Sequence, residues 1–367
     1  MKILIPFIAV LFFLTGCTKT NYSVQEYNPL KNNPSLAKKN NTNVNVSQKL
    51  DEIKTVESNH NDIISIIFPS QTIGKYALEA TNSINTYLIN KNKKFKLNVY
   101  DFEIQNKQNL FKTIKQIQED NITKVIAMIT KDDLHYLNDI SNIEKIQFYF
   151  PLINKQDIKN TEKLNKLNFT FGAISYKKQF EKLIDFAKDK PLVEFYGNSG
   201  IGRALHTYLK DEKIVYTKKI DDNNGRYKYF LENNKKLNNS VVLLNTPIVK
   251  SSILLSAINS QELTIQSIVS TQLNYTPLLF SLTQKHDRTK LVIANSIGKI
   301  PEELEEYNKL IGNNLSYSWV NYSTIIGTEY LLNGNITMFK DLSIENNQVQ
   351  FPVKLYRVGK SSFKLIK

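Results

Sequence analysis

Histidine and cysteine, the usual protein ligands of transition metals, are sparse and scattered in this chain of 367 residues. The four histidines are His60, His135, His206 and His286, and no two of them have the spacing that places both imidazoles on one helix face. The one cysteine, Cys17, does not complete a thiolate site by itself. The pattern therefore predicts no bound metal.

Serine and carboxylate groups give equally little support for catalysis. Ser199 lies in GNSGIG, which is not the Gly-x-Ser-x-Gly elbow that exposes a nucleophilic serine on a strained turn. Asp132 and Asp133 are adjacent in sequence, as are Asp221 and Asp222, so the carboxylates of each pair point apart. Such pairs suit helix caps and turns better than proton sharing. We therefore predict that the protein is not an enzyme.

Three glycines at residues 197–202 follow an apolar, strand-like run, at the place where a phosphate-binding loop would lie. Their order is Gly-x-x-Gly-x-Gly, whereas the dinucleotide fingerprint is Gly-x-Gly-x-x-Gly with an acidic residue about twenty positions later. The run IVYTKKI occupies that later place and does not end in an acidic residue. The stretch predicts a sharp strand-to-helix turn, and we expect no cofactor.

The amino-terminal segment MKILIPFIAVLFFLTGC has the layout of an export signal. Lys2 precedes an apolar run at residues 3–14, which is too short to cross a bilayer of about 30 Å as a helix. LTGC at 14–17 resembles the bacterial lipoprotein signal, which implies a signal peptide at 1–16 and acylation of Cys17. We expect a lipid-anchored protein on the periplasmic face of a membrane, with the outer membrane favoured.

Residues 17–61, directly after the signal peptide, are polar and rich in asparagine. They predict a flexible tether, because such a composition cannot bury enough surface to fold. The net charge of the chain, +14, would suit nucleic acid. However, the lysines are spread along the whole chain, and an exported protein rarely meets nucleic acid. We expect no nucleic-acid partner.

From residue 62 onward, apolar runs of strand length alternate with amphipathic helical stretches, and this rhythm restarts near residue 191. The alternation predicts two α/β lobes, each a doubly wound, Rossmann-like parallel sheet with helices on both faces. We place residues 62–190 in the first lobe and 191–297 in the second. Part of 298–335 should return to the first lobe, and the β-rich tail at 336–367 should join the second.

Specific stretches resemble the type I periplasmic binding proteins. IISIIFPSQTIGKYALEATNSINTYL resembles their opening strand, loop and helix, and LNVYDFE their second strand. FGAISYKKQFEKLIDFA resembles the helix of the crossover between the lobes, and LVEFYGNSGIGRALHTYLK the start of the second lobe. The resemblance covers nearly all of residues 62–366 and implies the type I fold.

Two kinds of protein with that fold are similar to this chain. Leu/Ile/Val-type receptors of ABC importers carry a Gly-Pro-Ser-type loop after the third strand, where MITKDDLHY stands here. Without that loop, the chain looks more like the LppC-type activators of penicillin-binding proteins. This resemblance implies a regulatory or scaffolding role toward an envelope protein such as cell-wall synthesis machinery. The alternative is a receptor for a small polar ligand such as an amino acid.

Ligand contacts should come from the loops at the carboxyl ends of the strands, because open α/β sheets bind ligands there and two lobes close across that edge. The polar residues in these loops suit turns and helix caps as well. The candidates are Ser70, Gln71, Asp101, Thr130, Lys131, Asn198, Ser199, Asn245, Thr246 and Thr271. Tyr76, Tyr196 and Tyr275 are candidates for the walls of such a pocket.

Overall fold

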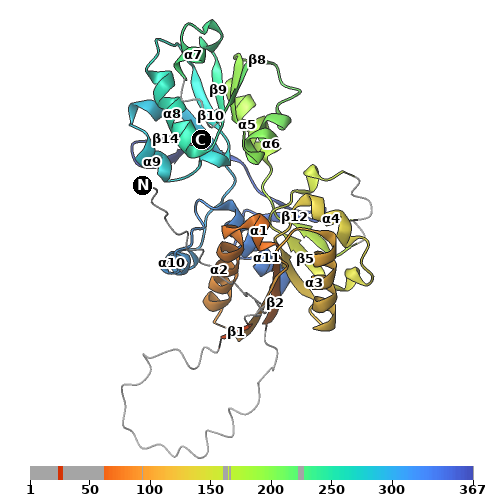
Figure 1. Ribbon diagram of the computed structural model, residues 1–367. Coiled ribbons are helices and arrows are strands. Elements are labelled where there is room, and N and C mark those ends of the chain that lie inside the picture. Colours follow the sequence, from red (N-terminus) through yellow and green to blue (C-terminus); the bar gives the residue numbers. More distant parts are fainter. Residues whose placement is uncertain are drawn as a thin grey trace, which may run out of the picture.

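A computed structural model describes residues 24–27, 62–92, 94–159, 164, 167–221 and 227–366. The predicted signal peptide, Cys17 and most of the predicted tether lie outside these residues. The described residues form two α/β lobes, each built around its own sheet. In Figure 1 the first lobe is mainly orange and yellow and the second is green and cyan.

The first sheet has eight strands in the order β1-β3-β2-β4-β5-β6-β13-β12. Their bounds are β1 Val24–Tyr27, β2 Asp62–Phe68, β3 Phe95–Asp101, β4 Lys124–Ala127, β5 Gln147–Phe150, β6 Phe169–Phe171, β12 Ser343–Glu345 and β13 Gln348–Gln350. The strands run parallel except β1 and β12, which pair antiparallel at the two edges.

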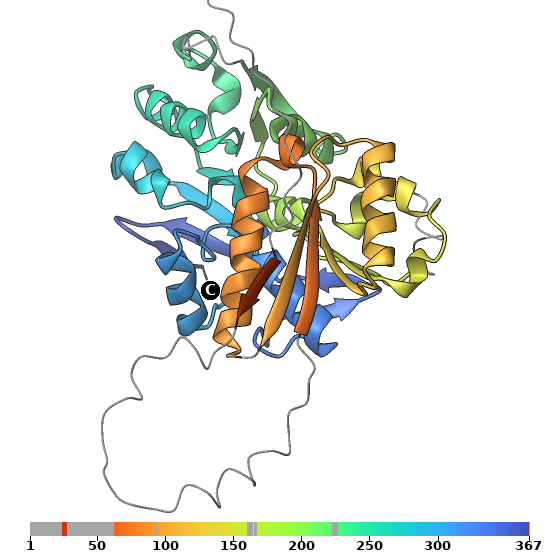
Figure 2. The same cartoon turned by 60° about the horizontal axis from the view of Figure 1, so that its bottom comes forward.

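Strand β1 lies within the segment that we predicted to be a flexible tether, and the prediction is wrong for residues 24–27. These residues pair with β3, whose outer edge would otherwise leave a row of backbone groups unpaired. Figure 2 shows the short β1 at this side of the first sheet.

Helices cover both faces of the first sheet because its strands are apolar on both sides. Their bounds are α1 Ser70–Ile73, α2 Lys75–Asn90, α3 Lys107–Glu119, α4 Lys131–Leu137, α10 Glu302–Leu310 and α11 Trp319–Asn333. Ile66 packs on the side of α2 and α11, whereas its neighbour Ile67 packs on the side of α3 and α4. This alternation is expected of a buried parallel sheet.

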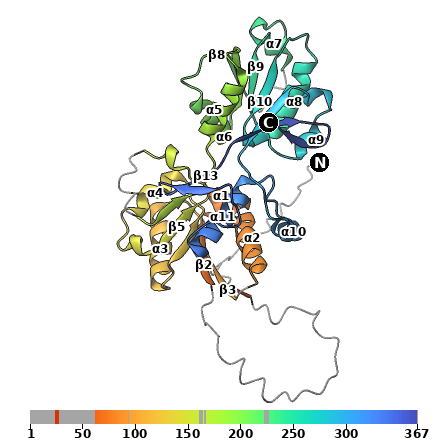
Figure 3. The same ribbon diagram turned by 180° about the vertical axis from the view of Figure 1, so that it is seen from behind.

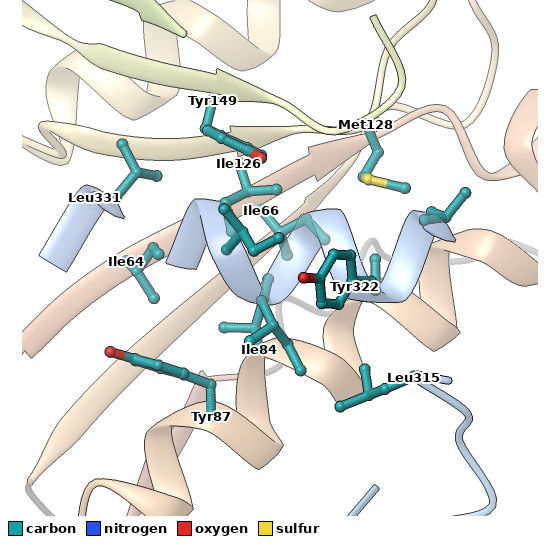
Figure 4. Packing of buried hydrophobic residues seen from close by; sticks show 14 of the residues in the cluster. Ile64, Ile66, Ile84, Tyr87, Ile126, Met128, Tyr149, Leu315, Tyr322 and Leu331 are labelled. Atoms are coloured by element: carbon teal, nitrogen blue, oxygen red, sulfur yellow. The ribbon is translucent and has the colours of Figure 1, made fainter. Parts of the chain in front are cut away.

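Helix α11 packs on both the sheet and α2, with side chains of both around it in Figure 4. Tyr149 of β5 is fully buried against this helix, and its hydroxyl lies 3.2 Å from the Ser323 hydroxyl. The Tyr149 ring approaches Gly172 and Gly327 so closely that a Cβ at either glycine would overlap it. Glycine at these positions therefore allows the helix to reach the sheet.

The second sheet has seven strands in the order β15-β14-β11-β10-β9-β7-β8, with β14 and β15 pairing antiparallel. Its strands are β7 Leu192–Gly197, β8 Ile214–Ile220, β9 Val241–Asn245, β10 Ser267–Ser270, β11 Leu291–Asn295, β14 Lys354–Val358 and β15 Phe363–Leu365. Helices α5 (Tyr176–Ala187) and α6 (Gly200–Tyr208) cover one face. Helices α7 (Lys228–Leu231), α8 (Ile248–Asn259) and α9 (Leu278–Leu282) cover the other.

The chain crosses between the lobes at residues 172–175, 296–301 and 351–353. Helices α10 and α11 lie between the last two crossings and pack in the first lobe. Figure 3 shows α5 and α6 with the second lobe and β13 with the first.

Two parts of the predicted lobe division are wrong. Helix α5 packs on the second sheet through Phe180 and Leu183, because the first crossing precedes the helix. The tail is divided: β14 and β15 join the second sheet as expected, but β12 and β13 join the first. Strand β13 pairs there with β6, and the Gln348 side chain accepts a hydrogen bond from the Lys155 amide at 2.8 Å.

None of the helices in the described ranges is both long enough and apolar enough to cross a membrane.

Candidate functional site

A cavity of about 740 Å³, which we call the interlobe cavity, has walls from both lobes. This volume lies within the range of roughly 300 to 1,000 Å³ that is common for small-molecule sites. The first lobe contributes the turn from α1 into α2, Thr130 and the residues that lead into α11. The second lobe contributes Ile201 and most of the segment 272–278.

Aromatic side chains form much of the wall, namely Tyr76, Tyr176, Tyr275, Tyr317 and Trp319. The Tyr275 and Tyr317 rings lie 5.4 Å apart, so they join residues of the two lobes. The Trp319 indole donates a hydrogen bond to the Tyr176 hydroxyl. Burial raises the pKa of Tyr176 and of Tyr275 above the ordinary value, so both phenols stay protonated at neutral pH.

Most polar groups of the interlobe cavity are already bonded. Lys75 Nζ lies 3.3 Å from Glu79 Oε1, one turn along α2. The Asn313 amide donates to the Glu79 carbonyl at 3.0 Å and to the Ser83 hydroxyl at 2.8 Å. These contacts hold the segment before α11 against α2, and they leave few groups ready to receive a ligand.

Two lining residues are exceptions, Gln272 and Asn321, and the Asn321 Oδ1 atom is buried without a hydrogen-bond partner among the described residues. Gln272 offers a donor. Its backbone amide donates to Gln179 Oε1 and its own Oε1 accepts from the Ser296 amide, both at 2.8 Å. Its side-chain nitrogen is buried and has no hydrogen-bond partner among the described residues. Gln272 also lines the interlobe cavity, so one lining residue carries a side-chain donor without a partner among the described residues.

The candidates after β2 and β3 form hydrogen bonds that connect two turns. Asp101 Oδ1 accepts hydrogen bonds from the Ser70 amide at 3.1 Å and from the Glu103 amide at 2.7 Å. The Gln71 amide donates to the Glu103 carbonyl at 3.0 Å. These contacts join the start of α1 to the end of β3, and none of the three candidates lines the interlobe cavity.

The two candidates after β4, Thr130 and Lys131, lie in different surroundings. Thr130 lines the interlobe cavity, where its hydroxyl accepts from Gln105 Nε2 at 2.7 Å and donates to Asp133 Oδ2 at 3.4 Å. Burial raises the pKa of Asp133, against the hydrogen bonds from Gln105 and Thr130, which lower it. Lys131 is exposed and lies outside the cavity lining.

The glycine stretch forms the predicted strand-to-helix turn. The Ser199 hydroxyl accepts from the Gly202 amide at 3.2 Å and caps α6. A Cβ at Gly202 would overlap the backbone of Gly197, so a side chain there would push the helix away from the strand. The Arg203 guanidinium donates to the Asn198 carbonyl. Asn198 and Ser199 therefore shape the turn.

The remaining candidates are fully buried in the second lobe. Asn245 Nδ2 donates to Glu194 Oε1 at 2.9 Å, and Glu194 Oε2 lies 2.7 Å from His206 Nδ1. The Thr246 hydroxyl bonds to the Ser251 hydroxyl at 2.7 Å. The Thr271 hydroxyl has no partner within the described ranges.

All ten predicted residues lie in the described part of the chain, and the structure brings Thr130 alone to the interlobe cavity. Of the three tyrosines expected as walls, Tyr76 and Tyr275 line it, whereas Tyr196 stacks on His206 and does not. Sequence reasoning missed Tyr317 and Trp319, which lie in a segment that returns from the second lobe. The closely spaced aromatic residues at 317–319 are the signal that could have found them. No group of three metal-binding side chains occurs in the described ranges.

Four large apolar side chains are exposed on the neighbouring helices α8 and α9. They are Val249, Ile253, Leu278 and Leu282, each between 43% and 56% exposed. We call them the α8–α9 apolar face. Leu278 also lines the interlobe cavity, so the face begins at the cavity's rim.

Comparison with known proteins rests on structure. The sequence matches no protein-family model and no curated protein. The structure of a putative branched-chain amino acid ABC transporter from Rhodospirillum rubrum matches with a TM-score of 0.63, at 11% identity, over 84% of this chain and 100% of that one. Streptococcus pneumoniae LivJ, a branched-chain amino acid binding protein solved with isoleucine, matches with a TM-score of 0.57 at 8% identity, over 84% and 100%.

The fold is that of the type I periplasmic binding proteins. The same fold also matches the C-domain of Haemophilus influenzae LpoA, described as a regulator of PBP1A, with a TM-score of 0.55 at 10% identity, over 83% of this chain and 100% of the domain. This chain spans 59% of full-length LpoA. Substrate-binding proteins of transporters and a regulator of PBP1A thus share this type I fold.

Proposed function

We propose that this protein is a non-enzymatic, lipid-anchored periplasmic protein that regulates or scaffolds an envelope partner such as cell-wall synthesis machinery. One observation carries the proposal. The ten polar side chains that we predicted at the strand ends, where this fold would place ligand anchors, bond to the protein itself or lie outside the interlobe cavity. A type I domain with few ready anchors is better suited to contact a partner than to capture a solute.

The α8–α9 apolar face supports contact with a protein. Exposed apolar side chains that gather on neighbouring helices are typical of interaction surfaces. Val249 and Ile253 lie one turn apart on α8, as Leu278 and Leu282 do in α9, so each helix presents a pair in the same direction. The role of LpoA as a regulator of PBP1A, on the same fold, points to a cell-wall synthase as the partner.

The test measures glycan polymerisation by a purified class A penicillin-binding protein of the same bacterium, with and without this protein. We expect the protein to change the rate, and we expect the double change Val249→Asp and Ile253→Asp to abolish the effect. Ser256→Asp, on the same exposed side of α8, is the matched control and should keep it. An unchanged rate, together with no crosslink between the two proteins in cells, would contradict the proposal.

A receptor for a small polar ligand is the second candidate, and the size of the interlobe cavity favours it. The unpartnered amide nitrogen of Gln272 would donate to such a ligand. A receptor should melt at a higher temperature with its ligand, since binding adds RT ln(1 + [L]/Kd) to the free energy of unfolding. No shift with the twenty amino acids or common dipeptides would exclude ligands of these classes.

The lipid anchor is a separate part of the proposal. Cys17 is the only residue of its type, so Cys17→Ser removes the acylation site without touching another cysteine. We expect the variant to leave the membrane fraction and wild type to stay in it. A variant that remains in the membrane with its signal peptide cleaved would show that something other than Cys17 holds the protein there.

A further inference from the structure

Four aromatic side chains meet at the boundary between the lobes, and we call them the aromatic clasp. Tyr275, Tyr356 and Phe363 come from the second lobe, and Tyr317 comes from the segment that leads into α11 of the first. We propose that the aromatic clasp couples the arrangement of the two lobes to the α8–α9 apolar face, an inference that rests on the proposed role of this face in binding a partner.

Tyr317 belongs to the first lobe because its turn is bonded to α11. The Tyr317 amide donates to Asn314 Oδ1 at 2.8 Å, and the Asn314 carbonyl accepts from Asn321 Nδ2, in the first turn of α11, at 2.9 Å. The Tyr317 ring nevertheless contacts the second lobe, with its centre 5.4 Å from that of Tyr275 and 6.1 Å from that of Phe363. A displacement of one lobe relative to the other would therefore disturb these contacts.

The aromatic clasp is continuous with α9. The ring centre of Phe363 lies 4.3 Å from that of Tyr275 and 4.9 Å from that of Phe280, which is on α9. Leu278 and Leu282 of the same helix are exposed and belong to the α8–α9 apolar face. At 3.6 residues per turn, Phe280 points to the opposite side of the helix from this pair. Helix α9 thus lies between the aromatic clasp and the partner surface.

The shortness of α9 makes its position depend on side chains packed against it. The helix has five residues, too few to be stable by itself. Leu279, which is fully buried, and Phe280 hold it on the lobe, and Phe280 also lies under the Arg288 guanidinium at 5.2 Å. Without Tyr317, Phe363 loses a neighbour and α9 is free to shift. Energetic coupling passes through contiguous packed side chains of this kind.

Trp319 reports on the same boundary. It is the only tryptophan of the chain and lies two residues after Tyr317. Its indole bonds to the hydroxyl of Tyr176, a residue of α5 in the second lobe. Separation of the lobes would break this bond and expose the indole to water, so the fluorescence emission of the protein would shift to longer wavelength.

Two measurements on the full chain test the coupling, each with the change in one lobe and the reading in the other. Tyr317→Ala should raise amide hydrogen exchange in α9, and Phe363→Ala should shift the Trp319 emission to longer wavelength. Tyr307→Ala in α10 and Leu365→Ala in β15 are the matched controls and should change neither, because both side chains are exposed and lie outside the aromatic clasp.

Coupling is reciprocal, so a change in only one of the two readings, or in neither, would overturn the proposal. Should Tyr317→Ala not fold, as judged by circular dichroism, Tyr317→Leu takes its place, since it keeps an apolar side chain without the ring.

Binding to the synthase separates the failure of this coupling from that of the proposed function. Surface plasmon resonance measures the affinity of the purified class A penicillin-binding protein for wild type and variants. We expect Tyr317→Ala to weaken it about fivefold or more, and Tyr307→Ala to keep it. If wild type binds no synthase, the proposed function fails, and the two readings across the lobes still decide the coupling. Equal affinities of wild type and Tyr317→Ala would overturn the coupling and leave the proposed function intact.

Discussion

The two lobes differ in the hydrogen bonds that stabilise the carboxyl ends of their strands. In the first lobe, Asp101 bonds to the backbone amides of Ser70 and Glu103 in turns that remain partly exposed. In the second lobe, Glu194 and Asn245 bond to each other where water does not reach. The first arrangement is local and replaceable by water, whereas the second has no substitute once a partner is removed.

The difference indicates which lobe can adapt at the interlobe cavity. The second lobe presents an edge held by buried side chains from β7, β9, β10 and α5. The first lobe presents short turns and aromatic side chains, with Tyr76 41% exposed. We expect the second lobe to act as the rigid side of the cavity and the first to adjust to whatever binds.

Glu194→Ala is expected to have the largest effect. It leaves the Asn245 amide and the His206 ring without their shared carboxylate and opens a hole in the sheet, at a cost of about 3 kcal/mol in the free energy of unfolding. Urea denaturation followed by circular dichroism measures the loss, with Glu181→Ala, an exposed change in α5, as the control. Hydrogen exchange should rise in β7 and β9. A variant as stable as wild type would remove the contrast between the lobes.

Asp101→Ala is expected to lower the free energy of unfolding by less, about 1 kcal/mol. The amides of Ser70 and Glu103 lose an acceptor, but water takes its place because the turns are accessible. The same denaturation experiment measures it, and exchange should increase only near residues 70–73 and 101–104. A loss equal to that of Glu194→Ala would mean that both lobes depend equally on their strand-end contacts.

Asp133→Asn tests the one strand-end carboxyl of the first lobe that is buried. Burial raises its folded-state pKa above the value of 3.8 that it has when exposed, so folding favours the protonated form. The stability that this group contributes is complete below pH 3.8 and is lost as the pH rises through the folded pKa. The variant should therefore gain stability relative to wild type over that pH range and keep the gain at neutral pH. A stability difference between variant and wild type that does not vary with pH would contradict a raised pKa of Asp133.

The alternation of apolar runs is enough to predict two lobes. It predicts a second lobe that begins near residue 191, and β7 of the second sheet begins at Leu192. The composition of the tail predicts β structure, yet its division between the lobes depends on β13 meeting β6, a partner far away in sequence. Local patterns do not encode such pairings, because any edge strand offers the same backbone groups.

The site is harder to predict for a related reason. Residue type and position correctly indicate polar groups at strand ends, but whether a group is free depends on partners that are remote in the chain. The side-chain nitrogen of Asn245, for example, donates to Glu194, 51 residues earlier. The return of part of 298–335 to the first lobe was predicted, but the pattern does not show that Tyr317 and Trp319 of this segment line the interlobe cavity.

Thr271→Val is expected to have the smallest effect. It tests whether a buried hydroxyl without a partner differs from one that has a partner. The Thr271 hydroxyl is fully buried and has no partner among the described residues, so a methyl group of the same shape should leave stability unchanged or raise it by up to about 1 kcal/mol. Thr246→Val is the matched control, since the Thr246 hydroxyl is buried and bonded to Ser251.

The Thr246→Val control should lose about 1 kcal/mol by the same denaturation measurement. A similar loss in Thr271→Val would mean that its hydroxyl has a partner, such as a buried water. In that case Thr271 offers no free hydroxyl at the edge of the second lobe, and the Gln272 amide remains as the donor at the interlobe cavity. A gain would instead mark the Thr271 hydroxyl as a group without a partner, directly before the turn that carries Leu273 and Tyr275 into the cavity wall.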